Sequence, residues 1–364
     1  MSKDGQTTGS VAPTLEGSSK DLLGYYRSMA LIRAFELRAS EMYAKARIGG
    51  YCHLNLGEEA AVVGLASALE RGDYLFTTYR DHGFALARGM SAKVVMAELF
   101  GRATGCSGGW GGSMHLFDAG LRFMGGYGIV GGQIPPATGA AMAIAYKGEP
   151  GPQSEAVMCV LGDGATNIGA FHESLNLASI WKVPIVYVVI NNGLGMGTVV
   201  DAASGEPDLY KRGCAYRIEG VRVDGDDPVA VKEAAASALA AARTERRPSI
   251  IEAMCSRLRG HSVVDPARYR TPEEVELARK ADPLPALRSR LIEAGVLDGD
   301  AASQIDAGAE REVDEAVAFA EESPFPDVST LFANTYATEV PNILRALPGE
   351  LALGWPGAEG ASSA

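Results

Sequence analysis

Residues 156–195 have the sequence AVMCVLGDGATNIGAFHESLNLASIWKVPIVYVVINNGLG, which contains two unbroken runs of six apolar residues. The runs, 156–161 and 185–190, are followed by Gly or Asn, a pattern typical of strands that are buried on both faces of a sheet. Between them, residues 167–181 are predicted to form a helix whose apolar stripe consists of Ile168, Phe171, Leu175 and Ala178. This order of elements predicts a βαβ unit with a right-handed crossover, and therefore an α/β fold with a mainly parallel sheet.

Polar residues follow both predicted strands at the same edge of the sheet. Residues 162–164 (GDG) follow the first strand, and residues 191–193 (NNG) follow the second. Adjacent parallel strands lie roughly 4.8 Å apart, and open α/β sheets bind ligands at the carboxyl ends of their strands. Asp163 offers a carboxylate and Asn192 an amide oxygen, which are ligands that suit Mg²⁺. The two strand ends therefore predict a divalent metal site.

The turn after Asp163 is predicted to bind phosphate. The backbone N–H groups of Gly164 and Ala165 lie at the start of the following helix, where anions are favoured. Asp-Gly and Asn-Gly are also ordinary turn formers, so either pair alone would indicate little. However, the 26 residues between Gly164 and Asn191 provide one helix and one strand. We therefore interpret the two pairs as parts of one site for a metal ion and a phosphate group.

Periodicity predicts several further elements. Helices are predicted for 21–46, 58–70, 91–101 and 227–246, a strand for 249–254 and an acidic helical region for 272–323. The glycine-rich segment 101–132 also contains large apolar residues, which favours an ordered loop close to a ligand or a partner chain. The expected organisation is a disordered leader (1–20), a single α/β domain (21–345) with a helical C-terminal region (about 272–345), and a flexible tail (346–364).

Charge and cysteine content restrict the function classes. The chain has 33 Lys and Arg against 45 Asp and Glu, a net charge of −12, which disfavours nucleic-acid and anionic-membrane surfaces. Five cysteines without a C-x-x-C spacing indicate reduced thiols in an intracellular, cytoplasmic protein. No run of about 18 apolar residues is present, so no membrane span is expected. Any phosphate must then be bound by a few groups at one site and not by a generally basic surface.

A family resemblance adds to this interpretation. The GDG and NN motifs with their spacing resemble the signature by which thiamine-diphosphate enzymes hold Mg²⁺ and the diphosphate. Five further motifs match the alpha subunits of 2-oxo acid and acetoin dehydrogenases in order: HLNLGEEA (53–60), TTYRDHG (77–83), GGSMH (111–115), GGYGIVGGQIPPATGAA (125–141) and RGHSVVDPARYRT (259–271). The resemblance covers roughly 21–337 and implies a thiamine-diphosphate-binding fold.

The resemblance implies roles for individual cofactor contacts. Tyr79 and Arg80 match a pair that contacts the diphosphate of the cofactor. A guanidinium group can pair bidentately with phosphate, so this role makes physical sense for Arg80. Gly128 and Val130 match positions whose backbone meets the aminopyrimidine ring. With Asp163, Gly164, Ala165 and Asn192 from the strand ends, and with His261, these residues form the expected cofactor site.

The resemblance also implies the metal ligands and the catalytic residues. The ligands would be the side chains of Asp163 and Asn192 and the backbone carbonyl of Leu194, a position where the family commonly has Tyr. His53 and His261 match active-site histidines, and we expect both to be catalytic. A histidine near the reacting carbonyl can donate a proton to a developing alkoxide or orient the carboxylate.

The implied activity is the oxidative decarboxylation of pyruvate with thiamine diphosphate and Mg²⁺, followed by acyl transfer to a lipoyl group of a dihydrolipoyl acetyltransferase. In this family a beta subunit supplies the glutamate that activates the cofactor, so an α₂β₂ assembly is expected and the chain alone should be inactive. Acetoin and branched-chain 2-oxo acid dehydrogenases are alternatives, although GMGT (195–198) and the 259–271 motif favour the pyruvate type. A nicotinamide-binding Rossmann domain would need a G-x-G-x-x-G spacing that GDGATNIG lacks.

Overall fold

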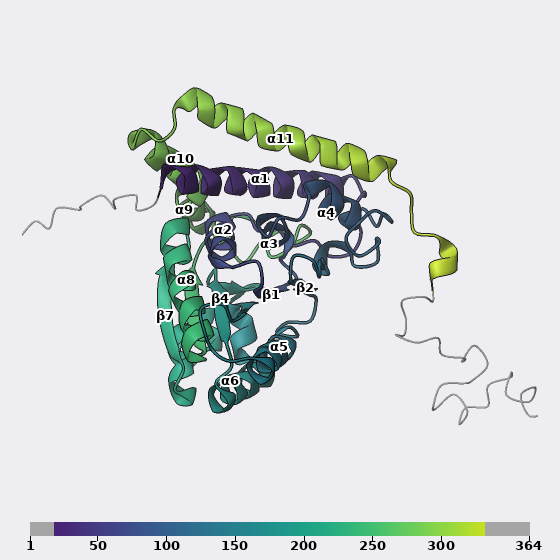
Figure 1. Ribbon diagram of the computed structural model, residues 1–364. Helices are drawn as coiled ribbons and strands as arrows, with labels where there is room; N and C mark the ends of the chain where they lie inside the picture. The colour runs from purple at the N-terminus through teal and green to yellow at the C-terminus, as the bar shows by residue number, and fades with distance from the viewer. Residues whose placement is uncertain (1–17, 332–364) are drawn as a thin grey trace, which may run out of the picture. The chain divides into compact units, whose positions relative to one another are not determined.

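The computed structural model describes residues 18–331, and a six-stranded sheet forms its centre. The strand order is β2-β1-β3-β4-β8-β7, and every neighbouring pair is parallel (Figure 1). The strands span Tyr74–Thr78 (β1), Phe123–Tyr127 (β2), Val157–Gly162 (β3), Ile185–Asn191 (β4), Glu219–Asp224 (β7) and Ser249–Met254 (β8). This arrangement confirms the predicted α/β fold with a mainly parallel sheet.

The structure confirms the predicted βαβ unit. β3 and β4 are immediate neighbours, and their register runs from Val157 opposite Ile185 to Gly162 opposite Ile190. Helix α6, Gly169–Trp181, connects them. Every residue of β4 is buried, because layers of helices cover both faces of the sheet. The polar residues that follow β3 and β4 therefore leave the sheet side by side.

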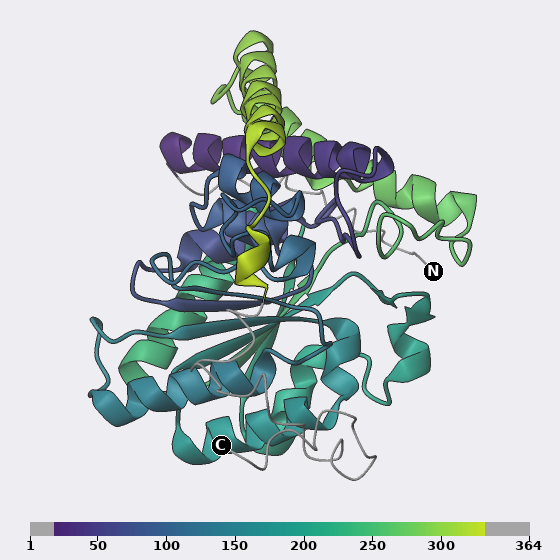
Figure 2. The same cartoon turned by 90° about the vertical axis from the view of Figure 1, so that its right-hand side faces the viewer.

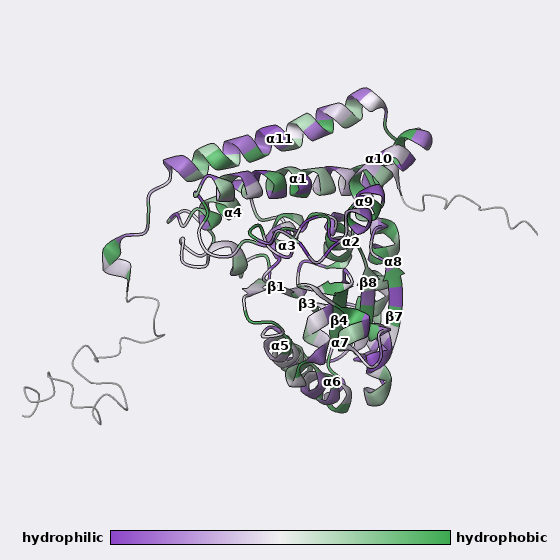
Figure 3. Ribbon diagram, turned by 180° about the vertical axis from the view of Figure 1, so that it is seen from behind, coloured by the Kyte–Doolittle hydropathy of each residue, from purple (hydrophilic) through white to green (hydrophobic). Residues whose placement is uncertain are grey.

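Helices cover the sheet on both faces. Helices α5 (Ile134–Lys147) and α6 pack on one face, while α2 (Glu59–Ala68) and α8 (Pro228–Glu245) pack on the other (Figures 1 and 2). Beyond α2 lies α1 (Ser19–Ala44), and α11 (Gly299–Glu322) packs on α1. Figure 3 shows hydrophobic strands at the centre of the sheet and many hydrophilic residues along α11.

The described part of the chain also contains shorter helices and strands. They include α3 (His82–Ala87), α4 (Ala92–Leu99), α7 (Val200–Ala203), α9 (Pro272–Lys280), α10 (Pro283–Glu293) and a hairpin of β5 (Leu194–Gly195) and β6 (Thr198–Val199). The helices predicted for 21–46, 58–70, 91–101 and 227–246 correspond to α1, α2, α4 and α8 within a few residues. The predicted strand 249–254 coincides with β8, and the predicted helical region contains α9, α10 and α11.

Several elements were not predicted, among them β1, β2, β7 and α5. β2 (FMGGY) contains two glycines inside the glycine-rich segment, so that segment is ordered but is not only a loop. β7 is half-exposed and charged, and β1 is only five residues long. α5 starts with Ile-Pro-Pro, and proline in the first turn is typical of a helix start, so this signal was overlooked. The helix start expected near Ala165 is also wrong, because 163–167 form a separate 3₁₀ turn before α6.

The contacts within the chain divide it into two units between Pro324 and Phe325. Helix α1 begins at Ser19, and the hydroxyl of Ser18 caps it by accepting a hydrogen bond from the backbone N–H of Asp21. The rest of the expected leader, the expected domain end at 345 and the tail 346–364 lie outside the described residues. Within 18–331, no helix is both long and apolar enough to cross a membrane.

A glycine in α2 allows this helix to approach α8 closely. A Cβ added at Gly64 would lie 2.7 Å from the carbonyl oxygen of Pro228 and 2.7 Å from Cβ of Val231.

We expect Gly64→Ala to lower the free energy of unfolding by about 1–3 kcal/mol through overpacking. Gly24→Ala in α1 is the matched control, because no atom lies within 4 Å of its added Cβ, and it should raise stability by about 0.5–1 kcal/mol. Urea denaturation would measure both, and a Gly64 variant as stable as wild type would contradict the packing argument.

Candidate active site

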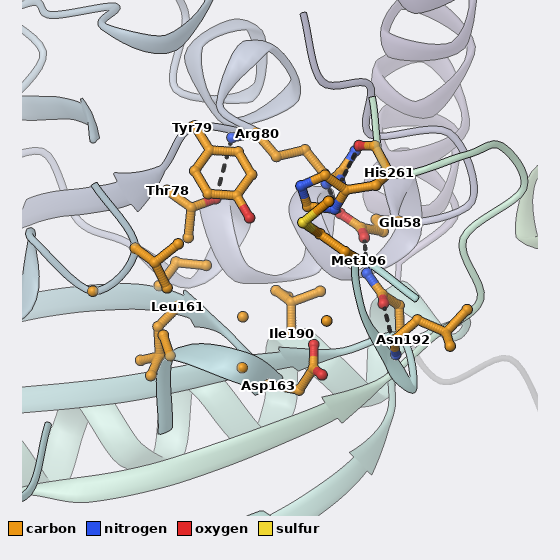
Figure 4. A pocket seen from close by; sticks show the side chains of 18 of the residues that line it. Glu58, Thr78, Tyr79, Arg80, Leu161, Asp163, Ile190, Asn192, Met196 and His261 are labelled. Carbon is orange, nitrogen blue, oxygen red and sulfur yellow. Dashed lines mark hydrogen bonds and ion pairs between the residues drawn. The ribbon is translucent and has the colours of Figure 1, made fainter. Parts of the chain in front are cut away.

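A cavity of about 240 Å³ lies at the carboxyl ends of β1, β3 and β4 (Figure 4). Its walls come from segments that are far apart in the sequence. They include Thr78, Tyr79 and Arg80 at the end of β1, residues 129–131 after β2, residues 162–165 at the end of β3, Asn192 and residues 194–196 after β4, and Arg257 and His261 after β8. The structure thus brings Tyr79, Arg80, Val130, Asp163, Gly164, Ala165, Asn192, Leu194 and His261 to one cavity.

Asp163 places a nearly buried carboxylate at the floor of this cavity. Burial raises the pKa of this carboxyl group, whereas hydrogen bonds from the backbone N–H groups of Asp163 and Gly164 oppose that rise. No ion pair to Asp163 is found among residues 18–331. Within the same residues, no cluster of three or more His, Cys, Asp or Glu side chains could hold a metal ion. A cation at Asp163 would therefore need amide and backbone oxygens as further ligands.

Asn192 and Leu194 supply such oxygens. The Asn192 Nδ2 group donates a hydrogen bond to Oε1 of Glu58 at 2.9 Å, and Asn192 Oδ1 accepts one from the backbone N–H of Leu194 at 3.2 Å. The Leu194 carbonyl accepts a hydrogen bond from Nη1 of Arg257 at 3.2 Å. Gly193 makes the turn between them with a positive φ of 78°. These oxygens and the Asp163 carboxylate suit a hard divalent cation such as Mg²⁺.

Two arginines give the cavity its positive charge. Arg80 is buried, and its Nη1 and Nη2 donate hydrogen bonds to the carbonyls of Leu54 (2.5 Å) and His261 (3.0 Å). A guanidinium has five N–H donors, so further donors remain for a ligand. Arg257 is also buried and binds the carbonyls of Leu194 and Met196. The other charged side chains of the lining are Glu58 and Asp163, so two positive charges balance two negative ones.

The two predicted catalytic histidines lie against each other. The ring centroids of His53 and His261 are 5.0 Å apart, and the His53 ring lies 4.4 Å from that of Tyr79. Burial and the charge of Arg80 lower the pKa of His53 to about 3 and that of His261 to about 4. Both rings are therefore neutral near pH 7. Among residues 18–331, their buried Nδ1 atoms have no hydrogen-bond partner. His261 lines the cavity, while His53 lies beside it.

The segment after β2 borders the cavity differently from the prediction. Ile129 and Val130 line it and are 77% and 49% exposed. Gly128 is not among the lining residues. A Cβ at Gly128 would lie 3.2 Å from Nε2 of His115, so in this structure the glycine accommodates the His115 ring. The family resemblance had instead implied close approach of a cofactor at Gly128.

Sequence reasoning missed two charged residues of the cavity, Glu58 and Arg257. Glu58 lies within the motif HLNLGEEA, but no spacing or charge pattern distinguished it from Glu59. In the structure Glu59 faces away and pairs with Arg33. Arg257 follows β8 in an irregular segment, and nothing in the sequence indicated that its side chain returns to the cavity.

The sequence is similar to known proteins over most of its length. The sequence model of the dehydrogenase E1 component family matches residues 27–329. The chain is 45% identical over 320 residues to the pyruvate dehydrogenase E1 component subunit alpha of Rhizobium meliloti, covering 88% of this chain and 91% of that protein. It is 40% identical to the protein of the same name from Rickettsia felis, covering 88% and 97%. It is also 40% identical to the mitochondrial somatic form from Homo sapiens, covering 88% and 81%.

The lowered pKa of His53 predicts a dependence of stability on pH. Unfolding restores the ordinary pKa of 6.5, so below that pH the unfolded chain binds a proton that the folded chain does not bind until about pH 3. Acid should therefore destabilise the protein across this range. We expect His53→Asn to lose less stability than wild type between about pH 7 and about pH 5.5, measured by urea denaturation. His172→Asn, which lies outside this cluster, should retain the wild-type loss. Equal losses of stability in wild type and His53→Asn would contradict the lowered pKa of His53.

Proposed function

Because this chain belongs to the dehydrogenase E1 component family, we propose that it is the alpha subunit of a thiamine-diphosphate-dependent pyruvate dehydrogenase. The observation that carries the proposal is that the buried Asp163 carboxylate and the Asn192 amide line one cavity together with two arginines. The reaction would be the oxidative decarboxylation of pyruvate, with acyl transfer to a lipoyl group of a dihydrolipoyl acetyltransferase. The matched relatives named above are all pyruvate dehydrogenase subunits.

Charge balance supports a metal-bound diphosphate. The four charged lining residues, Glu58, Asp163, Arg80 and Arg257, sum to zero, so a free diphosphate would meet Asp163 without a compensating cation. Mg²⁺ between Asp163, Asn192 and the Leu194 carbonyl would remove that repulsion and would itself be held by phosphate oxygens. The free N–H groups of Arg80 and the backbone of Gly164 and Ala165 would bind the phosphates.

When bound, thiamine diphosphate would supply the carbanion chemistry, acting as the electron sink for decarboxylation. The residues of this chain would position the substrate and control protons. The neutral rings of His53 and His261 can accept or donate a hydrogen bond at the pyruvate carboxylate or carbonyl. Tyr79, packed against His53, would fix the position of that ring. The apolar wall near Val130 would contact the aminopyrimidine and exclude water.

A beta subunit is part of the proposal. Both acidic residues of the lining, Glu58 and Asp163, lie at the end proposed to bind the diphosphate, so the glutamate that acts on the aminopyrimidine would come from another chain. The exposure of Ile129 and Val130 beside the cavity supports a partner at this edge. We propose an α₂β₂ heterotetramer that is active in the cytoplasm, where the five free cysteines would remain reduced.

The substrate can be tested directly. The chain should be inactive alone, and after co-expression with its beta subunit it should reduce an artificial electron acceptor with pyruvate as the preferred substrate. 2-Oxobutanoate, branched 2-oxo acids and acetoin are the comparison substrates. A preference for acetoin or for a branched 2-oxo acid would contradict the pyruvate assignment but not the cofactor.

The metal site gives a second test. We expect Asp163→Ala to weaken thiamine diphosphate binding by the assembled complex by more than about 100-fold, beyond the range typical for residues that only support a ligand. Chelation of divalent ions should abolish binding by wild type. Calorimetry would measure both, with the exposed Asp201→Ala as the control of unchanged affinity. Unchanged affinity in Asp163→Ala would remove the basis of the proposal.

A further inference from the structure

Glu58 connects the two halves of the cavity. It immediately precedes α2, is only 2% exposed, and turns both carboxylate oxygens toward other side chains. Its Oε1 accepts a hydrogen bond from Asn192 Nδ2 at 2.9 Å, and its Oε2 accepts one from Asn55 Nδ2 at 3.2 Å. Oε2 also lies 3.7 Å from Nε of Arg80 (Figure 4). One carboxylate therefore contacts both the proposed metal ligand and the proposed phosphate ligand.

The contact with Glu58 determines which way the Asn192 amide faces. A carboxylate only accepts hydrogen bonds, so the NH₂ group of Asn192 must face Glu58. The backbone N–H of Leu194 donates to the other end of the amide, which must therefore be the oxygen. Both contacts specify the same orientation, and it leaves Oδ1 beside the turn that carries the Leu194 carbonyl. Without Glu58, only the weaker contact with Leu194 would oppose an amide flip.

Glu58 also restrains Arg80. The guanidinium is held on three sides by Glu58 and by the carbonyls of Leu54 and His261. Asn55, which is fully buried, keeps the carboxylate in place and is itself fixed, because its Oδ1 accepts a hydrogen bond from the backbone N–H of Gly83 at 3.0 Å. This support leaves Arg80 with a single orientation before any ligand arrives, which lowers the entropy lost on binding.

The neighbouring asparagine provides a natural comparison. Asn191 Nδ2 donates a hydrogen bond to the buried Glu252 at 2.7 Å, and Glu252 also binds Arg222. The chemistry is the same as in the group formed by Glu58, Asn192 and Arg80, and both groups lie at the end of β4. However, neither Asn191, Glu252 nor Arg222 lines the cavity.

We propose that Glu58 is a positioning residue that fixes Asn192 for the metal ion and Arg80 for the diphosphate, and so couples the binding of the two. The proposal rests on the proposed function, because it assumes that the cavity binds a metal diphosphate. Glu58 does not need to touch either ligand. Its loss would free the Asn192 amide to rotate and would release Arg80 from its ion pair.

The test uses the full chain assembled with its beta subunit. Wild type, Glu58→Ala, Glu58→Gln and Glu252→Gln are titrated with MgCl₂ at fixed thiamine diphosphate, and with thiamine diphosphate at saturating MgCl₂, by calorimetry. Glu58→Ala should raise the half-saturating Mg²⁺ concentration by about 10–100-fold, the range for residues that orient metal ligands. Glu58→Gln should fall between Glu58→Ala and wild type, because an amide can satisfy Asn192 but not Asn55 and Arg80 at the same time. Glu252→Gln should bind as wild type.

A double-mutant cycle separates positioning from general stability. If Glu58 acts through Asn192, then Glu58→Ala should add little to the loss of Mg²⁺ affinity already caused by Asn192→Ala. A purely structural role would instead lower the melting temperature of the unliganded complex and leave the Mg²⁺ titration unchanged. An unchanged Mg²⁺ titration for Glu58→Ala, or equal effects of Glu58→Gln and Glu252→Gln on Mg²⁺ affinity, would overturn the proposal. If Glu58→Ala fails to assemble with the beta subunit, the Mg²⁺ affinities of Glu58→Gln and Glu252→Gln decide whether Glu58 is a positioning residue. Absence of binding by wild type would instead overturn the proposed function.

Discussion

The parallel register of β3 and β4 is the constraint on which the site depends. Because Gly162 pairs with Ile190, the chain leaves the sheet on neighbouring strands, with Asp163 one residue beyond this pair and Asn192 two residues beyond it. Two buried strands leave little freedom in this register, since a slip by one residue would turn every side chain to the opposite face. The apolar side chains between the helices thus fix two polar groups that lie far apart in the sequence. The turns after β1 and β8 then bring Arg80 and Arg257 to the same edge.

Desolvation determines how these groups behave. The same burial that raises the pKa of Asp163 lowers the pKa of His53 and of His261, because it disfavours the charged form of each group. The histidines therefore stay neutral beside an arginine. Glu58 stays close to Arg80 and to an amide, so that its charge is compensated locally. A cavity with balanced fixed charges and one carboxylate without a cation is suited to a ligand that brings its own metal ion.

The sequence predicted those parts of the structure whose signals lie in consecutive residues. The strands β3 and β4 were predictable because an unbroken apolar run between turn residues is typical of a buried strand, and Asp163 and Asn192 follow them directly. β1 was not predicted, although it carries Tyr79 and Arg80 at its end, because five residues give too short a pattern. β2 was hidden by its glycines. Glu58 and Arg257 could not be found, since their importance arises from contacts across the fold and not from their neighbours in the chain.

The paired asparagines illustrate why two adjacent residues of one type can have different tasks. Side chains alternate along a strand, so the last residue of β4, Asn191, and the next residue, Asn192, point to different surroundings. Asn191 stabilises the turn itself: its Oδ1 accepts a hydrogen bond from the backbone N–H of Gly193, and its Nδ2 binds Glu252. Asn192 turns toward the cavity and Glu58. An amide suits both positions because it can donate to a buried carboxylate and still offer an oxygen. Both oxygens accept the backbone N–H two residues further on, but only Asn192 lines the cavity, where its oxygen can also bind a cation.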